Sequence, residues 1–415
     1  MRVHVVDPSA YTPPYDHALC RALGAEGAEV ELFTSRFAYG PVAVPEGYRR
    51  RELFYRAARF APDRSKIGQR AQRIAKLAEH VPDMLRYRRA ARAADIVHFQ
   101  WLAVQHLDGF LLPRGRRASR TGHPAAPRRS RPALVLTAHD VMPREPRPGQ
   151  LSAQRRLYDR FDAIVVHSEH GRERLTRELG VDPDRVHVIP HGVFTHLAEA
   201  PPQPSPFQTD KPVVLCFGLM RPYKGIDVLL QAWRMLGTPP ADPLADPHTT
   251  PTTRPADPPA LDAELWIVGM PRMDISHLRA IAPPSVRFVP RFIADSELPA
   301  YFQRADLVVL PYREIDQSGV LFTALAFGKP LLLSDVGGFG EIAATGAART
   351  VSAGDPVALH GVLAELLGDP AALAAMAARA RDAIAGEYAW EMIARRTLTL
   401  YESLLREKAG GDHFK

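Results

Sequence analysis

The sequence is poor in cysteine and has no long apolar run. Its 415 residues include two cysteines, Cys20 and Cys216, which lie far apart in the chain. This spacing argues against a disulfide framework or a metal site and favours a reducing cytoplasm. No apolar segment approaches the roughly 20 residues that a membrane-spanning helix needs. The first residues, MRVHVVDPSAY, lack the apolar core of a signal peptide, so none is expected.

Acidic residues are absent from one stretch and scarce in another. Residues 111–132 contain seven arginines and no acid, and residues 49–95 contain fourteen Lys or Arg against five Asp or Glu. The whole chain carries a net charge of +7, so the remainder is net acidic. The basic first half can face nucleic acid, an anionic membrane surface or an acidic substrate, or it can be a solvated surface. No helix-turn-helix, zinc or RNA-binding signature accompanies the arginines, so we expect no nucleic-acid partner.

Short apolar runs alternate with helical patterns in the first half. Residues 3–6 predict a strand, a helix with Ala18, Leu19, Ala22 and Leu23 on one face follows, and a second strand lies at 30–33. Further strands are predicted at 96–99, 134–137, 163–166 and 186–189. Continuous apolar strands that alternate with helices are typical of a parallel sheet covered on both faces.

The pattern restarts after a proline-rich linker. Strands are predicted at 213–217, 265–268, 286–289, 307–310 and 331–333. The fold class is therefore α/β, with two Rossmann-like, doubly wound parallel-sheet domains that face a cleft. We place the first domain at 1–198 and the second at 199–385. Residues 386–415 are expected to form a helix that crosses back to the first domain, followed by a tail. Two proline-dense segments, 112–132 and 238–262, are expected to be disordered insertions.

The stretch GLMRPYKGIDVLL, residues 218–230, joins a predicted strand to a predicted helix. A helix N-terminus with free N–H groups is an anion site. Gly218 would let a ligand approach the backbone, and Arg221 and Lys224 would add full charges. The corner favours a compact anion such as a phosphate or diphosphate. The alternative is that Arg221 and Lys224 are only a solvated loop pair.

Several phrases then carry a family resemblance. FGLMRPYKGIDVLLQAW, LWIVG, VRFVPRFIADSELPAYFQRADLVVLPY, ALAFGKPLLLSDVGGFGEI and YAWEMIARRTLTLYESLL resemble the nucleotide-sugar-dependent glycosyltransferases of family 4, which have the GT-B fold. In the first half, YTPPYDHALCRAL, DIVHFQWL, LTAHDVMPRE, DAIVVHSEHGRERL and VHVIPHGV occur in the usual order and spacing. The resemblance covers nearly the whole chain apart from the two insertions and the basic stretch that follows residue 49.

The resemblance assigns donor-site roles in the second domain. Arg221 and Lys224 would hold the donor diphosphate, whose negative charge grows as the glycosidic bond breaks. The backbone of Ser318, Gly319 and Val320 would donate N–H groups to the diphosphate; the simpler alternative is a side-chain N-cap by Ser318, which would coexist with that role.

The backbone around Arg291 and Phe292 would read the edge of the nucleobase. The alternative for this pair is an ordinary turn between a strand and a loop. Family members transfer with retention of configuration and without a catalytic metal, so we expect neither a metal site nor a cofactor beyond the nucleotide sugar itself.

In the first domain, His139 resembles the family histidine near the transferred sugar, although a lone histidine can also be structural. Tyr15, Asp16 and His17 occupy the first loop, which in the family lies near the acceptor. Trp390 and the final helix would act as a structural hinge.

One position departs from the family pattern. The family carries two glutamates separated by seven residues, and Thr323 stands where the second glutamate, which grips the ribose, would be. Ile315 falls at the first position, and the neighbouring Glu314 could replace that glutamate if the loop shifts by one residue. Thr323 can make only an uncharged hydrogen bond to the ribose.

Together these features predict a cytoplasmic, retaining glycosyltransferase that moves a hexose from a nucleoside-diphosphate sugar. The acceptor is open, and the basic first domain suits a lipid or polysaccharide precursor at the inner face of a membrane. The alternatives are a catalytically silent sugar-nucleotide-binding or scaffold protein, which Thr323 would favour, and a glycosidic phosphorylase of the same fold. The sequence shows no sign of the pyridoxal-phosphate lysine that such a phosphorylase needs.

Overall fold

The computed structural model describes residues 1–38, 40–56, 66–102, 104–113, 131–142, 148–199, 201, 203–237 and 262–411. Most of both predicted insertions, residues 114–130 and 238–261, lies outside these ranges, so their disorder stays a prediction. The described chain forms two compact units. Unit 1 comprises Met1–Gly192 and Glu387–Lys415, and unit 2 comprises Val193–Gly386. The sequence places these borders after residues 198 and 385.

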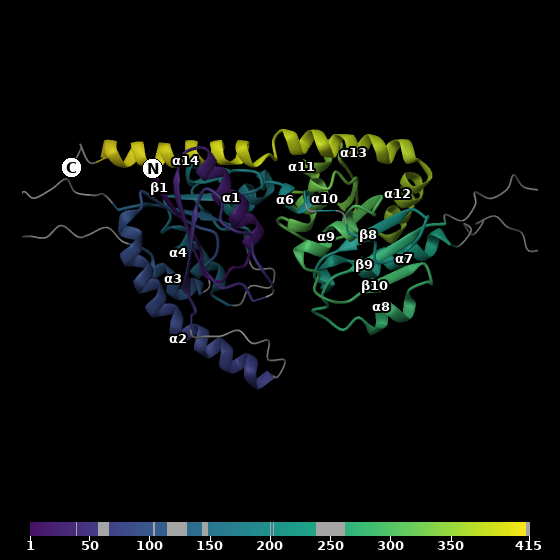
Figure 1. The fold of residues 1–415 in the computed structure, drawn as a ribbon, viewed down its shortest axis with the longest axis horizontal. Coiled ribbons are helices and arrows are strands. Elements are labelled where there is room, and N and C mark those ends of the chain that lie inside the picture. Colours follow the sequence, from purple (N-terminus) through teal and green to yellow (C-terminus); the bar gives the residue numbers. More distant parts are fainter. Residues whose placement is uncertain are drawn as a thin grey trace, which may run out of the picture. The chain divides into compact units, whose positions relative to one another are not determined.

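Unit 1 contains a seven-stranded, fully parallel sheet in the order β3-β2-β1-β4-β5-β6-β7 (Figure 1). Its strands are β1 (Arg2–Asp7), β2 (Glu29–Ser35), β3 (Arg49–Phe54), β4 (Ile96–Phe99), β5 (Ala133–Thr137), β6 (Ala163–Val166) and β7 (Val186–Val188). The strand order reverses between β1 and β4. Such a reversal opens a crevice at the carboxyl ends of the strands, where ligands of α/β sheets bind.

Unit 2 repeats this arrangement with six parallel strands in the order β10-β9-β8-β11-β12-β13. Its strands are β8 (Val213–Phe217), β9 (Glu264–Val268), β10 (Val286–Val289), β11 (Leu307–Leu310), β12 (Leu331–Ser334) and β13 (Ala348–Val351). The order here reverses between β8 and β11. The predicted α/β fold with two parallel, Rossmann-like sheets is confirmed.

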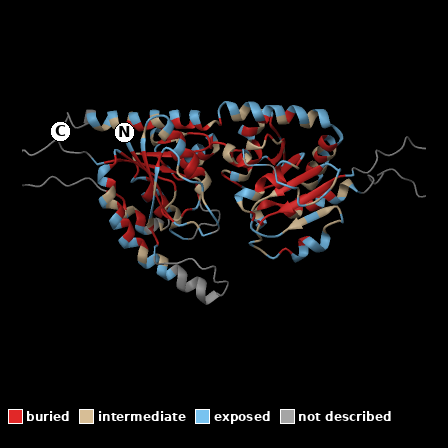
Figure 2. Ribbon diagram, viewed as in Figure 1, coloured by how far each residue is buried: buried red, intermediate tan, exposed pale blue. Residues whose placement is uncertain are grey.

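Helices cover the sheets of both units. Unit 1 has α1 (Pro13–Ala25), α2 (Lys66–Ala90), α3 (Gln105–Leu111), α4 (Gln150–Tyr158), α5 (Glu169–Glu173) and α14 (Trp390–Gly411). Unit 2 has α6 (Thr195–Ala198), α7 (Ile226–Leu236), α8 (Ser276–Ile281), α9 (Leu298–Phe302), α10 (Gly319–Ala326), α11 (Phe339–Ala343), α12 (Pro356–Gly368) and α13 (Pro370–Ala385). Figure 2 shows buried residues concentrated on the strands and exposed ones on the outer sides of the helices. Each unit therefore has its own apolar core.

The last helix, α14, packs on α1 of unit 1 although it follows unit 2 in the chain (Figure 1). Arg395 pairs with Glu26 at 3.0 Å. The Tyr401 hydroxyl lies 2.6 Å from Nδ1 of the buried His98 on β4. Trp390 packs against Gly192, where an added Cβ would lie 2.4 Å from the indole ring. These contacts bring the final helix back to the first domain, as expected from the sequence.

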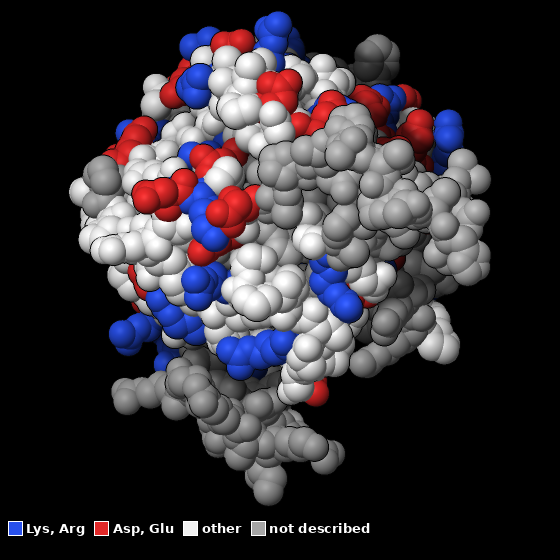
Figure 3. Space-filling view, turned by 90° about the vertical axis from the view of Figure 1, so that its right-hand side faces the viewer, with Lys and Arg blue, Asp and Glu red and all other residues white. Residues whose placement is uncertain are grey.

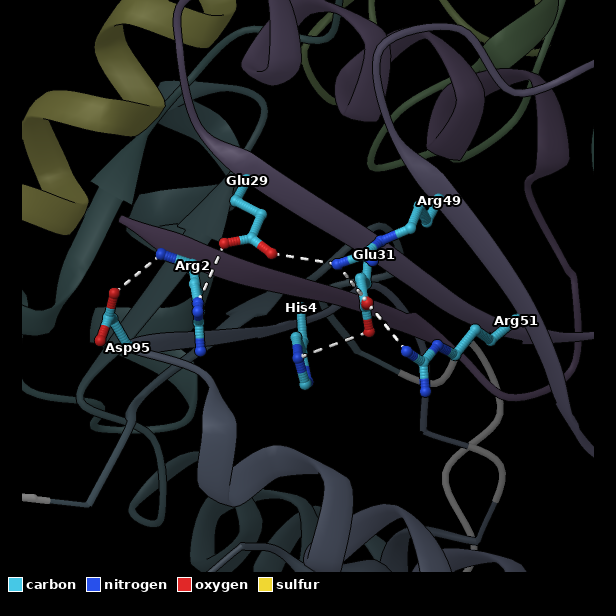
Figure 4. A network of polar contacts seen from close by, with 7 residues as sticks. All are labelled: Arg2, His4, Glu29, Glu31, Arg49, Arg51 and Asp95. Carbon is cyan, nitrogen blue, oxygen red and sulfur yellow. Dashed lines mark hydrogen bonds and ion pairs between the residues drawn. The ribbon is translucent and has the colours of Figure 1, made fainter.

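The edge strand β3 is not predicted by the sequence, because RRRELF lacks the apolar character of the other strands. Its arginines meet carboxylates of β2 (Figure 4). Glu31, whose side chain is 10% exposed, accepts from Arg49 at 2.9 Å and from Arg51 at 3.0 Å. Charged side chains protect an edge strand from pairing with another chain. These two arginines are therefore neutralised within the sheet and add little to a basic surface.

Helix α2 carries much of the remaining basic stretch. A buried hydrogen-bonded chain fixes it, because His80 bonds the Tyr55 hydroxyl at 2.7 Å and Asp108 at 2.6 Å. The large apolar residues of this basic stretch differ in burial: Phe54 is buried and Leu53 packs against the core. Ile74 and Leu77 point outward instead, as described below. Phe60 and the side chain of Ile67 lie outside the described part.

Charge and apolar length bear on possible membrane contact. The face drawn in Figure 3 carries both acidic and basic side chains. Among the described residues no single helix has the length and apolar character of a membrane span. One pair of helices, Pro356–Gly368 and Pro370–Ala409, bent by 96°, passes the same test jointly, by length and composition alone.

Candidate active site

The loop after β8 forms a tight corner in unit 2. β8 ends at Phe217, a single 3-10 turn spans Pro222–Lys224, and α7 begins at Ile226. Gly225, between them, has a φ of 64°, and a Cβ there would lie 1.9 Å from the Pro311 carbonyl oxygen. Only glycine fits this conformation and this contact. The corner is thereby held against the loop that follows β11, across the point where the strand order reverses.

The lysine predicted to bind diphosphate is buried. Lys224 is 7% exposed, and its ammonium donates to the Tyr312 hydroxyl while lying 3.7 Å from the centre of that ring. A Cβ on Gly218 would lie 3.8 Å from Nζ of Lys224 and 3.1 Å from Cγ2 of Val320. The alternative of a solvated loop pair is therefore wrong for Lys224. Its amine lies beside Gly218 and the first turn of α10.

The N-terminus of α10 completes this cluster. Ser318 is its N-cap residue with extended backbone angles, but its side chain makes no capping hydrogen bond. The Ser318 hydroxyl lies 3.4 Å from the Tyr312 hydroxyl instead. The alternative of a side-chain cap is therefore wrong. The first-turn N–H groups of Gly319 and Val320, where the helix dipole is positive, suit an anion.

Arg221 is exposed and is the N-cap of the 3-10 turn. Within the described ranges, no carboxylate lies within ion-pair distance of its guanidinium. The neighbouring Arg313 differs, because it forms two hydrogen bonds with Asp227, at 2.9 and 2.6 Å. Arg221 can therefore turn its full charge toward a bound anion, whereas Arg313 holds the start of α7.

The predicted base-reading segment follows β10. The Arg291 guanidinium pairs with Glu297 through two hydrogen bonds, at 3.0 and 2.6 Å, and also donates to the Phe292 carbonyl at 3.0 Å. Glu297 in turn raises the pKa of Arg291 by accepting these bonds. The Phe292 ring is 39% exposed. Arg291 thus orders this loop, and the recognition of a nucleobase by its backbone stays a prediction.

The departure from the family pattern has a clear local structure. Glu314 is exposed on the loop after β11, and Ile315 beside it is 9% exposed. Thr323 lies inside α10, is 8% exposed, and donates its hydroxyl to the Gly319 carbonyl at 3.0 Å. The Thr323 oxygen can therefore only accept from a further partner. The sugar-side role of Glu314 and the ribose-side role of Thr323 remain predictions.

In unit 1, His139 follows β5 and belongs to a chain of imidazoles. Its Nδ1 lies 3.2 Å from Nε2 of His167, and Nδ1 of His167 lies 3.0 Å from the Ile189 carbonyl oxygen. Burial lowers the pKa of His167 to about 4, and it lowers the pKa of His139 well below its ordinary value, with neighbouring imidazoles adding to the effect. Trp101 stacks on His139, with ring centres 5.0 Å apart. Both histidines are therefore neutral at pH 7.

The three acceptor-side residues do not lie in the first loop. Tyr15, Asp16 and His17 belong to α1, which starts at Pro13. Proline is favoured at the first positions of a helix, so α1 begins before its apolar pattern does. All three residues are buried, and the ring of Tyr15 packs edge-on against His139 at 4.7 Å. The loop placement is therefore wrong, and the acceptor-side role stays a prediction.

The surroundings of Tyr15, Asp16 and His17 are polar. Burial raises the pKa of Asp16 well above its ordinary value, and the carboxylate of Asp7 adds to this shift. His17 bonds the Tyr48 hydroxyl at 3.0 Å through Nδ1. Asp7 accepts from the backbone of Tyr11 at 2.6 Å and therefore shapes the loop before α1.

A cavity of about 530 Å³ opens beside His139 at the carboxyl ends of β4 and β5. The described residues that line it are Tyr11, Gln100, Trp101, Leu102, Leu136, Thr137, Ala138, His139, Asp140, Met142, Gln150, Gln154, Leu157 and Tyr158. Its walls combine aromatic rings with side-chain amides. Its position is the one that the strand-order reversal favours for a ligand of unit 1.

Sequence reasoning missed several of these groups. His167 and His191 are far from His139 in the sequence, and only the folded sheet brings the three imidazoles together. The ring centre of His167 lies 5.0 Å from that of His139 and 5.1 Å from that of His191. Tyr312, the partner of Lys224, stands in the quoted phrase VVLPY without a motif of its own. The one available signal was position, because Tyr312 follows a predicted strand, where binding residues gather.

Comparison with known proteins agrees with this geometry. Residues 15–197 match the family model described as "Glycosyltransferase Family 4", and residues 211–369 match "Glycosyl transferases group 1". The two parallel sheets and these matches define a GT-B glycosyltransferase, and the protein is therefore an enzyme. Its family is glycosyltransferase family 4, as the sequence phrases indicate.

One relative and two solved structures of the same fold illustrate the likeness. A D-inositol 3-phosphate glycosyltransferase of Xylanimonas cellulosilytica is 29% identical over 423 residues, covering 94% of this chain and 91% of the relative. The sucrose-phosphate synthase of Thermosynechococcus elongatus has a TM-score of 0.69 at 19% identity, covering 98% and 100% of the two chains. HepE of Anabaena, solved with UDP-glucose, has a TM-score of 0.63 at 16% identity, covering 97% and 100%.

Proposed function

We propose that this glycosyltransferase moves a hexose from a nucleoside-diphosphate sugar to an acceptor with retention of configuration. One observation carries the proposal: Lys224 is buried beside Gly218 and the uncapped start of α10, with the exposed Arg221 on the same corner. A buried ammonium next to free N–H groups is a site for a compact anion.

The proposed mechanism follows from this charge arrangement. Departure of the nucleoside diphosphate moves negative charge onto the leaving phosphate oxygens. Fixed cations and N–H dipoles that already point at this position stabilise that charge in the transition state without reorganising. The hydrogen bond to Tyr312 already fixes the Lys224 ammonium, so little side-chain entropy is lost when the ammonium contacts the diphosphate. A metal ion is not part of this proposal, and His139 keeps its proposed place near the transferred sugar.

A thermal-shift screen tests the donor. Nucleoside diphosphates and their hexose conjugates should raise the melting temperature, because a ligand that binds only the folded state stabilises it. We expect one base to be preferred. If none of these compounds raised the melting temperature, the proposal would be contradicted. A protein that no longer binds a sugar donor would then be favoured. HepE was solved with UDP-glucose, which makes the uridine series the first to try.

The acceptor side has one further observation, an apolar stripe on α2. Ile74, Leu77, Val81 and Leu85 recur at helical spacing and are 63%, 48%, 36% and 44% exposed. The exposed Arg89 at the end of the same helix adds positive charge, whereas the exposed Arg86 is paired with Asp83 at 2.6 Å. We propose that this face rests on an anionic bilayer, since an apolar face with basic flanks is typical of interfacial helices. The cytoplasmic location stays a prediction.

Vesicle sedimentation tests this docking. Binding to vesicles that contain phosphatidylglycerol should fall as salt rises, because exposed charges are screened over about 10 Å at 0.1 M salt. The double variant Ile74→Ser, Leu85→Ser should lose most of the binding. Val357→Ser, which alters a similarly exposed valine on α12, is the matched control. No binding of the wild-type protein at low salt would rule the membrane surface out.

A further inference from the structure

Two buried carboxyl groups of unit 1 contact each other. Asp7 is the last residue of β1 and is 0% exposed, and Asp16, near the start of α1, is 1% exposed. The carboxyl groups of the two residues are hydrogen-bonded to one another. Two ionised carboxylates in a buried contact would repel each other strongly, so such pairs share one proton. Asp7 and Asp16 together therefore carry one negative charge at pH 7.

The contacts of Asp7 decide which residue holds the proton. Its carboxylate oxygens accept from the backbone N–H groups of Ser9 at 3.1 Å, Tyr11 at 2.6 Å and Thr12 at 3.2 Å. Hydrogen bonds from N–H donors stabilise an ionised carboxylate. Within the described ranges, Oδ1 of Asp16 is buried and has no hydrogen-bond partner, which would be costly if Asp16 were charged. Asp7 is therefore the carboxylate, and Asp16 is the neutral acid that donates to it.

The surrounding groups support this assignment. Burial raises the pKa of Asp16 well above its ordinary value, and the Asp7 carboxylate raises it further. The positive charge of Lys76, on α2, lies near Asp7 and favours its ionised form. Burial also raises the pKa of the other titratable groups that face Asp16, so these are uncharged at pH 7. They are Tyr15 and Cys20 on α1 and Tyr48, which precedes β3.

Residues 8–12 form the loop between β1 and α1, named loop 8–12, and its backbone conformation needs support. Ala10 has a φ of 49°, in the left-handed region that residues other than glycine rarely adopt. The Trp101 indole donates to the Thr12 hydroxyl at 3.0 Å, but three backbone N–H groups of the loop bond only the Asp7 carboxylate among the described side chains. Displacement of this carboxylate would therefore free the loop to leave its strained conformation.

Loop 8–12 also contributes a wall of the cavity beside His139. Tyr11 lines this cavity, is 59% exposed, and packs edge-on against Trp101, with ring centres 5.3 Å apart. Trp101 lines the same cavity. The backbone N–H of Tyr11 makes the shortest of the three bonds to Asp7, so the carboxyl pair sets the position of this wall.

We propose that Asp7 and Asp16 form a proton-dependent latch, which holds loop 8–12 against the cavity while Asp16 keeps its proton and releases it when that proton is lost to solvent. Only the O–H bond of Asp16 breaks in this step. The new negative charge then repels the Asp7 carboxylate and displaces it from the loop. Because the held state binds one more proton, release increases as the pH rises. The inference concerns the conformation of unit 1 and does not depend on the proposed transferase activity.

Amide hydrogen exchange of the ligand-free protein, followed by mass spectrometry from about pH 6 to about pH 10, tests the latch. Exchange protection of the peptide that contains loop 8–12 should fall by up to about tenfold per pH unit above the pKa of Asp16, because release is linked to the loss of one proton. The internal reference is the peptide with Val357 and Ala358, whose N–H groups bond Asp355 at 2.9 and 3.0 Å. Equal pH dependence of the two peptides would overturn the proposal.

The variant Asp16→Asn separates the proton from the hydrogen bond. Its amide still donates to Asp7 but does not titrate, so loop 8–12 should stay protected over the whole pH range. Asp184→Asn, which alters an exposed acid of unit 1, is the matched control and should keep the response of the wild type. A fall in protection in Asp16→Asn as large as that in the wild type would show that another group titrates, and the latch would be wrong.

A measurement on the wild-type protein covers the possibility that Asp16→Asn does not fold. Carbon NMR of protein labelled at the aspartate carboxyl groups reports the protonation state of each. At pH 7 the signal of Asp16 should be that of a carboxylic acid, and the signal of Asp7 that of a carboxylate. An ionised Asp16 at this pH would overturn the proposal, whatever the nucleotide screen shows for the transferase.

Discussion

The two units share one strand order but differ in what they place at the carboxyl ends of their strands. Unit 1 gathers neutral imidazoles and side-chain amides around Trp101 and His139. Unit 2 gathers glycines, a buried ammonium and the open start of a helix around Lys224. The imidazoles of the first set are neutral at pH 7, whereas the second set carries a buried positive charge. The comparison teaches that the sheet determines where a ligand can bind, whereas the side chains on the loops determine which kind of ligand binds there.

The largest effect should come from removing the ammonium of unit 2. Lys224→Met keeps most of the buried stem but no charge, so turnover should fall at least about 100-fold, the scale of one lost preorganised electrostatic contact. Arg221→Ala should have a similar effect. Initial-rate kinetics with the best donor measure it, with Lys211→Met as an exposed control. Transfer at the wild-type rate in Lys224→Met would remove the anion role from this corner.

Folding of Lys224→Met needs a check, because the lysine is buried rather than on a solvated loop. The Tyr312 hydroxyl loses its donor in this variant. The melting temperature should therefore be recorded beside the rate. A folded variant that has lost turnover supports a role in chemistry, whereas a rate loss that follows the fraction unfolded does not.

Acid should weaken unit 1 before unit 2. Burial lowers the pKa of His4 to about 4, of His98 to about 3 and of His167 to about 4, and all three lie in unit 1. The unfolded chain binds protons at these residues below about pH 6.5, while the folded chain does not. Stability is therefore full above that pH and falls toward pH 4.

Asp7 and Asp16 oppose this trend, since their raised pKa values favour the folded state in acid, but they are two groups against seven described histidines of unit 1 whose pKa is lowered. Urea unfolding followed by pulsed hydrogen exchange at one labelling pH resolves the two units. The midpoint of unit 1 should fall more than that of unit 2 between pH 7 and 4.5. Equal falls would show that the buried histidines do not set the acid stability.

A smaller effect is expected at the position that departs from the family pattern. Thr323→Glu should supply charged hydrogen bonds to the two ribose hydroxyls and raise nucleotide affinity roughly tenfold. Donor sugar preference should not change, because the contact is to ribose. Calorimetric titration and the melting temperature are measured together. A marked loss of stability would mean that the carboxylate is buried and unpaired, as a residue only 8% exposed allows.

The smallest effect should follow Arg51→Ala on the edge strand. Arg51 shares the Glu31 carboxylate with Arg49, and its own side chain is 54% exposed. Surface ion pairs contribute about 0–1 kcal/mol, so stability should change by less than about 1 kcal/mol. Thermal unfolding at low and high salt measures this. A larger loss would give β3 a greater share in the stability of unit 1 than its exposure implies.

Strands with uninterrupted apolar runs could be predicted from the sequence, because burial on both faces requires them. β3 and β13 could not. β3 begins with three arginines, of which Arg49 and Arg51 pair with carboxylates of β2, and ARTV of β13 is half polar. The corner between β8 and α7 could be predicted from its spacing, but the burial of Lys224 could not, because Tyr312 comes from a loop far along the chain.

The return of α14 to unit 1 has a consequence for synthesis on the ribosome. The hydrogen-bond partner of His98 is the hydroxyl of Tyr401, which is synthesised 303 residues later. The indole of Trp390, which packs against Gly192, is also synthesised late. Unit 2 is synthesised in full before α14 appears, so it can fold while unit 1 still lacks one wall. A nascent chain halted after residue 386 would hold a complete unit 2 joined to an incomplete unit 1. Such a chain would be a natural substrate for chaperones, because the face of α1 that α14 covers would still be bare.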